Sequence, residues 1–493
     1  MITYGISANS HDAALAVFDK KQLVFASHAE RFSGVKNDAH LNSELLDYVM
    51  HNFGSADRVV WYENPIKKSL RQLWAGQGWQ FKENNIAKYL ESFGINAPLK
   101  CSSHHHSHAA AGYYTSPYDN ATVICIDSIG EFETLTVWKA EDEKLRRVYS
   151  QGYPHSVGLW YSAMTQRVGL KPNEDEYILM GMAAYGYPDR LYADIKRDFF
   201  EVLRYGSPEV KFRTNLHRGC RKWRPDLKTK QDMFDIAAAT QKIYEEILFN
   251  ILLWCRKHSG LPSKNIILMG GCALNCLANK IAYDMYENVW IMPNPGDAGS
   301  AIGAVVADWR EHIDWQTPYL GYDIRKPYPV KEIVKELETK GLVGVANGKA
   351  EYGPRALGNR SLLADPRGIE MKDRVNNIKK RQKFRPFAPV ILKEEAHKYF
   401  EVSKDFDSPY MQCVVTCKFP DTYPAIVHAD GTSRVQTVSK ENHPELYKTL
   451  KLWKKQTGCP MLLNTSLNIK GKPMVNNEED AEAFAKHYNV KVV

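Results

Sequence analysis

The sequence predicts an α/β protein built from two domains. The chain is 493 residues long, which exceeds the length of an ordinary single hydrophobic core. Short β-type runs bounded by turn residues alternate with segments of helical periodicity. A stretch rich in Pro, Gly and Tyr, DWQTPYLGYDIRKPYP, interrupts this alternation. We therefore place a first domain at residues 1–325 and a second domain at residues 326–493.

The first domain opens with three short strand-like runs, at residues 2–7, 14–18 and 22–27. Turn residues separate them, so they predict an antiparallel meander. A second pair of strand-like runs follows at residues 122–126 and 134–138 and predicts a second hairpin.

Longer elements follow in both domains. Apolar side chains at helical spacing predict a helix over residues 233–257, and the run NIILMGG predicts a buried strand over 265–271 that ends in two glycines. A helix is expected at 272–283, and a helix at 331–340 followed by a strand at 342–346 opens the second domain. A polar motif after the first strand, a second hairpin and glycine turns at later strand ends favour an actin/Hsp70-like duplicated nucleotide-binding domain.

Composition limits the classes of protein. Hydrophobic residues make up 44% and charged residues 25%, which is typical of a globular protein. No run of about 18 apolar residues occurs, so we expect no membrane span. The nine cysteines include no CxxC pair, which predicts free thiols. The first residues lack the basic region of a signal peptide, so we expect a cytoplasmic protein, where thiols stay reduced. The net charge of +8 favours a nucleic-acid partner or phosphorylated small molecules.

The densest site signal is the run HHHSH. His104 and His108 are four residues apart, so on a helix both imidazoles face one side and can share a divalent ion. Asp297, between glycines in NPGDAG, is the first candidate to complete the ligand set. Asp127, which ends the run VICID, is the second candidate. The alternatives are a hydrogen-bonded histidine cluster without metal, and a turn or helix cap at Asp127.

Two further motifs belong to the first domain. Gly270 and Gly271 come directly before a predicted helix, where backbone amides suit phosphate or ribose oxygens. His11 and Asp12 lie at the tip of the first strand, where nucleotide-binding domains of this type place reactive groups. The simpler interpretation of each motif is structural.

The second domain carries an anion-binding pattern. Residues 349–385 hold eleven Lys/Arg against four Asp/Glu, and GPRALGNRS places arginines between glycines and a proline. The planar guanidinium suits the oxygens of phosphate and similar anions. The run MLLNTSLNIKGKP at 461–473 reads as a strand that breaks into the polar rim of a pocket. We therefore expect an anionic substrate in this domain.

Together the motifs resemble those of the NodU/CmcH-type O-carbamoyltransferases. The matching segments include HDAALAVF, HHHSHAAAGYY, CIDSIGE, LMGGCALNCLAN, PNPGDAGSAIGA, EYGPRALGNRSLLADPR, FRPFAPVIL and LLNTSLNIKGKP, in the family's order along nearly the whole chain. The resemblance implies an actin-like N-terminal domain of the threonylcarbamoyl-transferase type and a YrdC-like C-terminal domain. It also implies that carbamoyl phosphate and ATP give a carbamoyl-adenylate, which a metal-bearing site transfers to an acceptor hydroxyl.

The same resemblance assigns roles to individual residues. It implies that His104, His108 and Asp297 bind a divalent metal (Fe, Zn, Mg or Mn), with Asp127 nearby in a catalytic role and His11 as general base. Nucleotide contacts in the first domain are implied for Gly271 and Asn275. The implied pocket for carbamoyl phosphate and ATP comprises Arg355, Arg360, Lys380, Arg385, Arg434, Ser466 and Asn468.

The acceptor is the least determined partner. Residues 204–230 hold nine Lys/Arg and two acidic residues, and Tyr205, Phe212 and Trp223 lie among them. Basic side chains interleaved with aromatics suit a phosphate backbone and an extruded base, which favours a hydroxymethylated base in DNA, such as 5-hydroxymethylcytosine, or its nucleotide. The alternatives are a solvated basic loop with a secondary-metabolite or sugar hydroxyl as acceptor, and a non-catalytic nucleic-acid-binding relative. The oligomeric state stays open.

Overall fold

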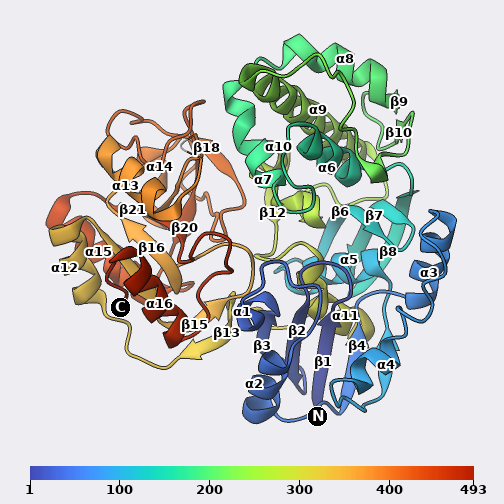
Figure 1. Ribbon diagram of the computed structural model, residues 1–493, viewed down its shortest axis with the longest axis horizontal. Helices are drawn as coiled ribbons and strands as arrows, with labels where there is room; N and C mark the ends of the chain where they lie inside the picture. The colour runs from blue at the N-terminus through green and yellow to red at the C-terminus, as the bar shows by residue number, and fades with distance from the viewer. Residues whose placement is uncertain (383) are drawn as a thin grey trace. The chain divides into compact units, whose positions relative to one another are not determined.

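The computed structural model describes residues 1–382 and 384–493, which form two units (Figure 1). The first unit comprises residues 1–29 and 37–315, and the second comprises residues 30–36 and 316–493. The first unit therefore ends before the expected boundary at residue 325. The reason is that β13 (Tyr319–Ile324) pairs antiparallel with β15 (Gly348–Glu351) of the second unit.

The first sheet of unit 1 has the strand order β3-β2-β1-β4-β5. Its first three strands form the predicted antiparallel meander, and β4 and β5 add to it in parallel. The strands, in sheet order, are β3 (Gln22–His28), β2 (Ala14–Asp19), β1 (Ile2–Ser7), β4 (Arg58–Trp61) and β5 (Leu99–Cys101).

The second sheet of unit 1 repeats this plan. Its order is β8-β7-β6-β11-β12, with β8, β7 and β6 antiparallel and β11 and β12 parallel to β6. Order and directions match those of the first sheet, so the predicted actin/Hsp70-like duplication is confirmed by the topology itself. The strands are β6 (Asn120–Gly130), β7 (Glu133–Glu141), β8 (Lys144–Gly152), β11 (Asn265–Met269) and β12 (Asn288–Trp290); β9 (Phe200–Leu203) and β10 (Val210–Phe212) form a separate hairpin.

Helices α5 (His104–Tyr114) and α11 (Ser300–Trp309) pack against each other between these sheets. The approach is close, because a Cβ at Gly303 would overlap the carbonyl oxygen of Ser107. The long predicted helix is α9 (Lys230–Lys257), which starts at a capping box formed by Thr229 and Asp232. The remaining helices of unit 1 are α2 (Ser43–Phe53), α3 (Pro65–Trp74), α4 (Ile86–Glu91), α6 (Val157–Arg167), α7 (Glu176–Met182), α8 (Asp189–Phe199) and α10 (Cys276–Met285).

Unit 2 is built on a mixed sheet with the order β14-β16-β21-β17-β20. β16 and β21 pair with each other inside this sheet. The motif GPRALGNRS leads into β16, and the motif MLLNTSLNIKGKP begins with β21. Its strands are β14 (Leu342–Ala346), β16 (Arg360–Ala364), β17 (Ala388–Leu392), β20 (Gln436–Val438) and β21 (Met461–Ser466), and β18 (Val414–Thr416) pairs with β19 (Thr432–Arg434). Its helices are α1 (Glu30–Ser33), α12 (Val330–Lys340), α13 (Ile369–Lys379), α14 (Ala396–Tyr399), α15 (Pro444–Thr457) and α16 (Glu478–Tyr488).

Two sequence expectations are refined by these elements. Helix α10 begins at Cys276, later than the expected residue 272, because residues 271–274 form a 3₁₀ turn and Asn275 caps the helix. Among the described residues, none of the helices is both long and apolar enough to cross a membrane.

Candidate functional site

Two histidines and two aspartates converge inside unit 1. His104 and His108 lie one turn apart at the start of α5, Asp127 lies on β6, and Asp297 lies in the turn that leads into α11. All four side chains are buried, and one ligand atom from each lies within 4.8 Å of the others. The structure thus joins both carboxylates named from the sequence to the two histidines.

The distances within this cluster are short. His104 Nε2 lies 3.1 Å from Asp127 Oδ2, 3.2 Å from Asp297 Oδ1 and 3.1 Å from His108 Nε2. His108 Nε2 lies 3.3 Å from Asp297 Oδ1. Burial lowers the pKa of His104, but the charges of Asp297 and Asp127 outweigh it and raise that pKa well above 6.5.

This donor set fits a divalent cation. Two imidazole nitrogens and two carboxylate oxygens are the ligands that zinc and the neighbouring transition metals accept. Asp297 Oδ1 is buried and has no hydrogen-bond partner among the described residues, which a bound cation would supply. We name the set His104, His108, Asp127 and Asp297 the metal centre.

Further side chains lie beside the outer nitrogens of the two histidines. His108 Nδ1 lies 3.2 Å from Ser300 Oγ, and His104 Nδ1 lies 3.8 Å from Glu63 Oε2. Glu63 is itself paired with Lys68, at 2.5 Å, and both side chains are buried. Such outer contacts fix the ring orientation of a ligating histidine. Sequence reasoning missed Glu63, although it follows the carboxyl end of β4, the edge at which sites of α/β sheets collect.

The other two histidines of the run point elsewhere. His105 Nδ1 lies 2.9 Å from Thr136 Oγ1, and burial lowers the pKa of His105 well below 6.5. His106 stacks on Trp138 with ring centroids 5.5 Å apart. Two of the four histidines therefore face the centre, as the i, i+4 spacing predicts.

His11 lies at the edge of the metal centre. Its Nε2 is 3.8 Å from Asp297 Oδ2, and its Nδ1 is 3.3 Å from Asp12 Oδ2. Desolvation lowers the pKa of His11, but the hydrogen bond with Asp12 and the charge of Asp297 outweigh it and raise the pKa to about 10. The His11 side chain is 43% exposed, so an incoming molecule can reach it.

The glycine turn after β11 serves the same centre. The Gly271 amide donates a hydrogen bond of 3.1 Å to Asp127 Oδ1, which orients that carboxylate. The Asn275 side chain accepts from the Ala278 amide and bonds in both directions with Gln241. Both residues predicted to contact a nucleotide thus already make polar contacts inside unit 1.

In unit 2 a buried carboxylate organises the GPRALGNR loop. Glu351 Oε1 accepts the backbone N–H groups of Leu357, Asn359 and Arg360 at 2.7, 2.9 and 3.1 Å. The Arg360 guanidinium is fully buried and donates only to backbone carbonyls, those of Tyr322, Asn347, Gly348, Asn359 and Asn476. This placement makes Arg360 a brace for the loop and differs from the expected ligand contact.

The lysine beside Ser466 and Asn468 is Lys379 and not the expected Lys380. Lys380 ends α13 in a left-handed conformation and is exposed, whereas Lys379 is buried. Lys379 Nζ donates to the carbonyl oxygens of Ser466, at 2.6 Å, and of Asn468, at 3.2 Å. Burial and the charges of Arg381 and Arg385 lower the pKa of Lys379 well below 10.5. Lys379 therefore takes the place expected for Lys380 beside Ser466 and Asn468.

The remaining arginines of the predicted pocket are partly buried. Arg355 precedes Ala356, whose carbonyl accepts from Asn464 Nδ2 on β21, so its loop is tied to the strand that carries Ser466. Arg434 ends β19, and its buried Nε has no hydrogen-bond partner among the described residues. Lys379, Ser466 and Asn468 are in contact with one another, and Arg355 and Arg385 are the arginines expected beside them; we name this expected set the anion site.

The basic segment 204–230 is more packed than its composition indicates. Phe212 is buried, and the Trp223 ring lies 5.3 Å from Phe199 while its Nε1 donates to Asp198 Oδ2. Arg224 pairs with Asp194 and Asp226. The exposed basic side chains of its central part are Arg213, Arg218, Arg221 and Lys222.

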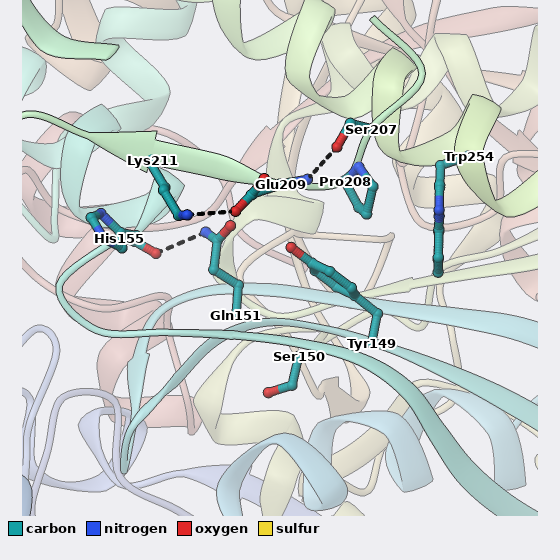
Figure 2. A pocket seen from close by; sticks show the side chains of 9 residues that line it. All are labelled: Tyr149, Ser150, Gln151, His155, Ser207, Pro208, Glu209, Lys211 and Trp254. Carbon is teal, nitrogen blue, oxygen red and sulfur yellow. Dashed lines mark hydrogen bonds and ion pairs between the residues drawn. The ribbon is translucent and has the colours of Figure 1, made fainter. Parts of the chain in front are cut away.

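Part of this segment lines a pocket of about 500 Å³ (Figure 2). Its polar side chains are largely paired with one another: Lys211 Nζ lies 2.7 Å from Glu209, and Gln151 Nε2 donates to the His155 carbonyl. The lining residues are Tyr149, Ser150, Gln151, His155, Ser207, Pro208, Glu209, Lys211 and Trp254. None of them belongs to the metal centre.

Comparison with known proteins places both units in one family. Residues 73–306 match the family model described as carbamoyltransferase N-terminus, and residues 334–493 match carbamoyltransferase C-terminus. Nodulation protein NolO of Bradyrhizobium diazoefficiens is 33% identical over 77% of this chain and 75% of its own. The uncharacterized protein sll1178 of Synechocystis is 32% identical over 97% and 93%.

A third relative is named for the reaction that it catalyses. The 3'-hydroxymethylcephem-O-carbamoyltransferase of Amycolatopsis lactamdurans is 28% identical over 97% of this chain and 95% of its own. The matched models cover the metal centre and the anion site in the same order as the two domains expected from the motifs. The chain therefore belongs to the carbamoyltransferase family and is an enzyme of that family.

Proposed function

We propose that the protein is an ATP-dependent O-carbamoyltransferase that makes carbamoyl-adenylate and transfers its carbamoyl group to a hydroxyl. The observation that carries the proposal is the buried metal centre with His11 at its edge, in a unit that matches the carbamoyltransferase N-terminus. A second, basic site in unit 2 supplies the place for an anionic, activated substrate.

The activation step belongs to the anion site. Carbamoyl phosphate and water give carbamate and phosphate; a carbamate oxygen then attacks the α-phosphorus of ATP, and pyrophosphate leaves. Arg355 and Arg385 neutralise phosphoryl oxygens, since the guanidinium fork matches their geometry. Lys379 is held by the carbonyl oxygens of Ser466 and Asn468, and burial lowers its pKa, so an anion bound beside it would favour its charged form.

The transfer step belongs to unit 1. The acceptor oxygen bonds to the carbamoyl carbon, AMP leaves with the electron pair of the broken bond, and His11 takes the hydroxyl proton. His11 can do so in its neutral form, which a cation bound at the metal centre would favour by offsetting the charges of Asp297 and Asp127 that raise its pKa. Asp12 holds the His11 ring through Nδ1, so Nε2 faces the metal centre. A divalent cation, when bound by the four ligands, polarises the carbamoyl group and offsets negative charge on it.

For the acceptor we propose a primary hydroxyl on a ring substituent. The relative named as a hydroxymethylcephem O-carbamoyltransferase supports this class. A hydroxymethylated DNA base, such as 5-hydroxymethylcytosine, presents the same CH₂OH group, and exposed Arg218, Arg221 and Lys222 favour a phosphate backbone. A secondary-metabolite or sugar hydroxyl is favoured by the packing of Trp223, which removes one stacking surface.

The test is a reconstituted reaction. The purified full chain, supplied with a divalent metal, is incubated with carbamoyl phosphate, ATP and one acceptor at a time, and mass spectrometry reads the products. The acceptors are hydroxymethylated DNA, the corresponding nucleotide and hydroxymethyl-bearing small molecules. We expect phosphate and pyrophosphate release with every acceptor and a carbamoylated product with one class.

Two controls make the outcome decisive. Omitting ATP should stop product formation, because carbamoyl phosphate alone does not give the adenylate. Carbamoyl transfer that proceeds without ATP, or without pyrophosphate release, would contradict the proposed intermediate.

A further inference from the structure

Helix α3 (Pro65–Trp74) reverses the usual arrangement of an amphipathic helix: polar side chains face the protein interior and apolar side chains face solvent. Its buried residues are polar or charged: Lys68, Ser69 and Arg71. Its exposed residues include Ile66 (62% exposed), Leu70 (47%), Leu73 (41%) and Trp74 (61%). These four fall at positions i, i+4, i+7 and i+8, so they form one apolar stripe along the helix. We name this stripe, with Trp79 beyond its end, the α3 face.

The inner side of α3 has a structural reason for its polarity. Lys68 Nζ donates to Glu63 Oε1 and to the Asn9 carbonyl, and Glu63 faces His104 of the metal centre. Arg71 Nε donates to the Glu131 carbonyl at 3.0 Å. These contacts explain why the helix turns its cations inward. They do not explain why the outer positions of the helix, which face water, carry apolar side chains.

The α3 face is large enough to form the centre of a protein interface. At about 150–250 Å² per aromatic side chain, Trp74 and Trp79, which is 67% exposed, leave roughly 200–300 Å² open to water between them. Ile66, Leu70 and Leu73 extend the patch. Phe132 is 37% exposed, and its ring centroid lies 6.4 Å from that of Trp74. Apolar patches of several hundred Å² mark interaction sites, and a standard interface takes about 800 Å² per partner.

The shape and charge of the face select among partners. It is the convex side of a helix, whereas small molecules bind in concave pockets. A helix that lies on a lipid surface carries several cations on its exposed polar side, but on α3 Lys67 alone is an exposed cation, and Lys68 and Arg71 are buried. The stripe spacing is that of a helix packing on another helix.

We propose that the α3 face binds the α3 face of a second copy of this chain in a twofold dimer. The face carries no charge within its stripe, so it meets itself without like-charge repulsion. Exposed Lys67 lies next to the stripe on α3, and the segment after Trp79 exposes one residue of each sign, Lys82 and Glu83. Twofold homodimers with one self-complementary patch are the commonest soluble oligomers. This inference is independent of the proposed acceptor and reaction.

The experiment measures the mass of the full chain in solution over a concentration series, by light scattering and sedimentation. We expect a dimer that Leu70→Glu and Trp74→Glu each convert to a monomer, because a charge would face its own copy in the interface. The matched control is Phe419→Glu, which alters an aromatic of similar exposure (46%) in the other unit and should leave the dimer intact. Far-ultraviolet circular dichroism confirms that each variant is folded, and Trp79→Ser serves as a milder second variant.

Several results would overturn the proposal. One is a chain that stays monomeric at every concentration; another is a dimer that survives both glutamate substitutions with intact fold. Sedimentation of the wild-type chain with phosphatidylcholine vesicles, lost in Trp74→Glu, would assign the face to a lipid surface instead.

Discussion

Glu63 Oε2 faces His104 Nδ1 at 3.8 Å, while the opposite nitrogen of that ring points into the metal centre. The carboxylate is buried, and its second oxygen is held by Lys68 at 2.5 Å. Glu63 thus favours the tautomer in which Nδ1 carries the proton and Nε2 offers its lone pair to a cation. We therefore expect Glu63 to position His104 and not to bind a cation itself.

Glu63→Gln should weaken metal binding. Loss of an outer partner of a ligating histidine typically costs 10–100-fold in metal affinity, and we expect a loss of about that size. The measurement is competition with a chromophoric chelator for Co²⁺ or Zn²⁺, which does not depend on turnover. Glu44→Gln, at an exposed position on α2, is the matched control and should bind metal as wild type does. Unchanged affinity in Glu63→Gln would contradict the positioning role.

His108→Ala should abolish carbamoyl transfer while pyrophosphate release dependent on ATP and carbamoyl phosphate continues. The reason is that the metal centre and the anion site lie on different units. His104→Ala should behave in the same way. His106→Ala is the control, since that ring stacks on Trp138 and faces away from the centre. Loss of pyrophosphate release with retained transfer from supplied adenylate would reverse the two roles.

Lys379→Met and Lys380→Met should have different effects on pyrophosphate release. Lys379 is buried against Ser466 and Asn468, so its loss should block pyrophosphate release, whereas the exposed Lys380 should be dispensable. Arg355→Ala and Arg385→Ala should each weaken the apparent affinity for carbamoyl phosphate, by about 1.5–3 kcal/mol for a lost charge-assisted contact. Normal adenylate output from a folded Lys379→Met variant would remove that lysine from the anion site.

The salt dependence of DNA affinity distinguishes a polynucleotide acceptor from a small molecule. If residues 204–230 contact a polynucleotide, replacing Arg218, Arg221 and Lys222 together with Ala should flatten the slope of log affinity against log salt, because fewer counterions are released. Fluorescence anisotropy with hydroxymethylated DNA measures the slope, and Trp223→Ala should act mainly through stability, since its ring is packed on Phe199. Absence of DNA binding at low ionic strength would assign the acceptor to small molecules.

Acid should destabilise unit 2 through His443. Its Nδ1 accepts the Leu446 amide at the start of α15, its Nε2 lies 3.0 Å from Asn359 Oδ1, and burial lowers its pKa from 6.5 to about 4. The unfolded chain therefore binds this proton first, so stability is full above pH 6.5 and falls by roughly 3 kcal/mol as the pH drops to about 4. His443→Asn keeps the helix cap and cannot titrate. Its denaturation midpoint should depend less on pH than that of the wild type over that window.

Much of the metal centre could be predicted because it depends on local spacing. His104 and His108 are one helical turn apart, and the glycines around Asp297 mark a tight turn in the sequence itself. Asp127 was a second candidate because a strand end is also a common place for a cap. Its inclusion needed the pairing of β6 with β11, which brings Gly271 to its carboxylate.

Other features depend on contacts that no local pattern encodes. Which of two adjacent lysines turns inward depends on where α13 ends, and a one-residue difference exchanges Lys379 for Lys380. Arg360 lies in a loop whose composition predicts anion binding, but the carbonyls of Tyr322, Asn347, Gly348 and Asn476, together with that of its neighbour Asn359, take up its guanidinium. Lys68 and Arg71 are buried in spite of their charges, because α3 turns them toward Glu63 and the backbone of Glu131.

The short segment of residues 30–36 has a practical meaning for anyone who wishes to cut this protein in two. It groups with unit 2 although the chain before and after it belongs to unit 1. Its Arg31 is buried and donates to the Gly353 carbonyl, at the start of the loop that carries Arg355. A fragment that starts at residue 316 would lack this arginine and leave that carbonyl without its donor. Unit 2 is thus completed by a piece of chain that lies almost three hundred residues upstream of its main body, and no single cleavage point yields both halves intact.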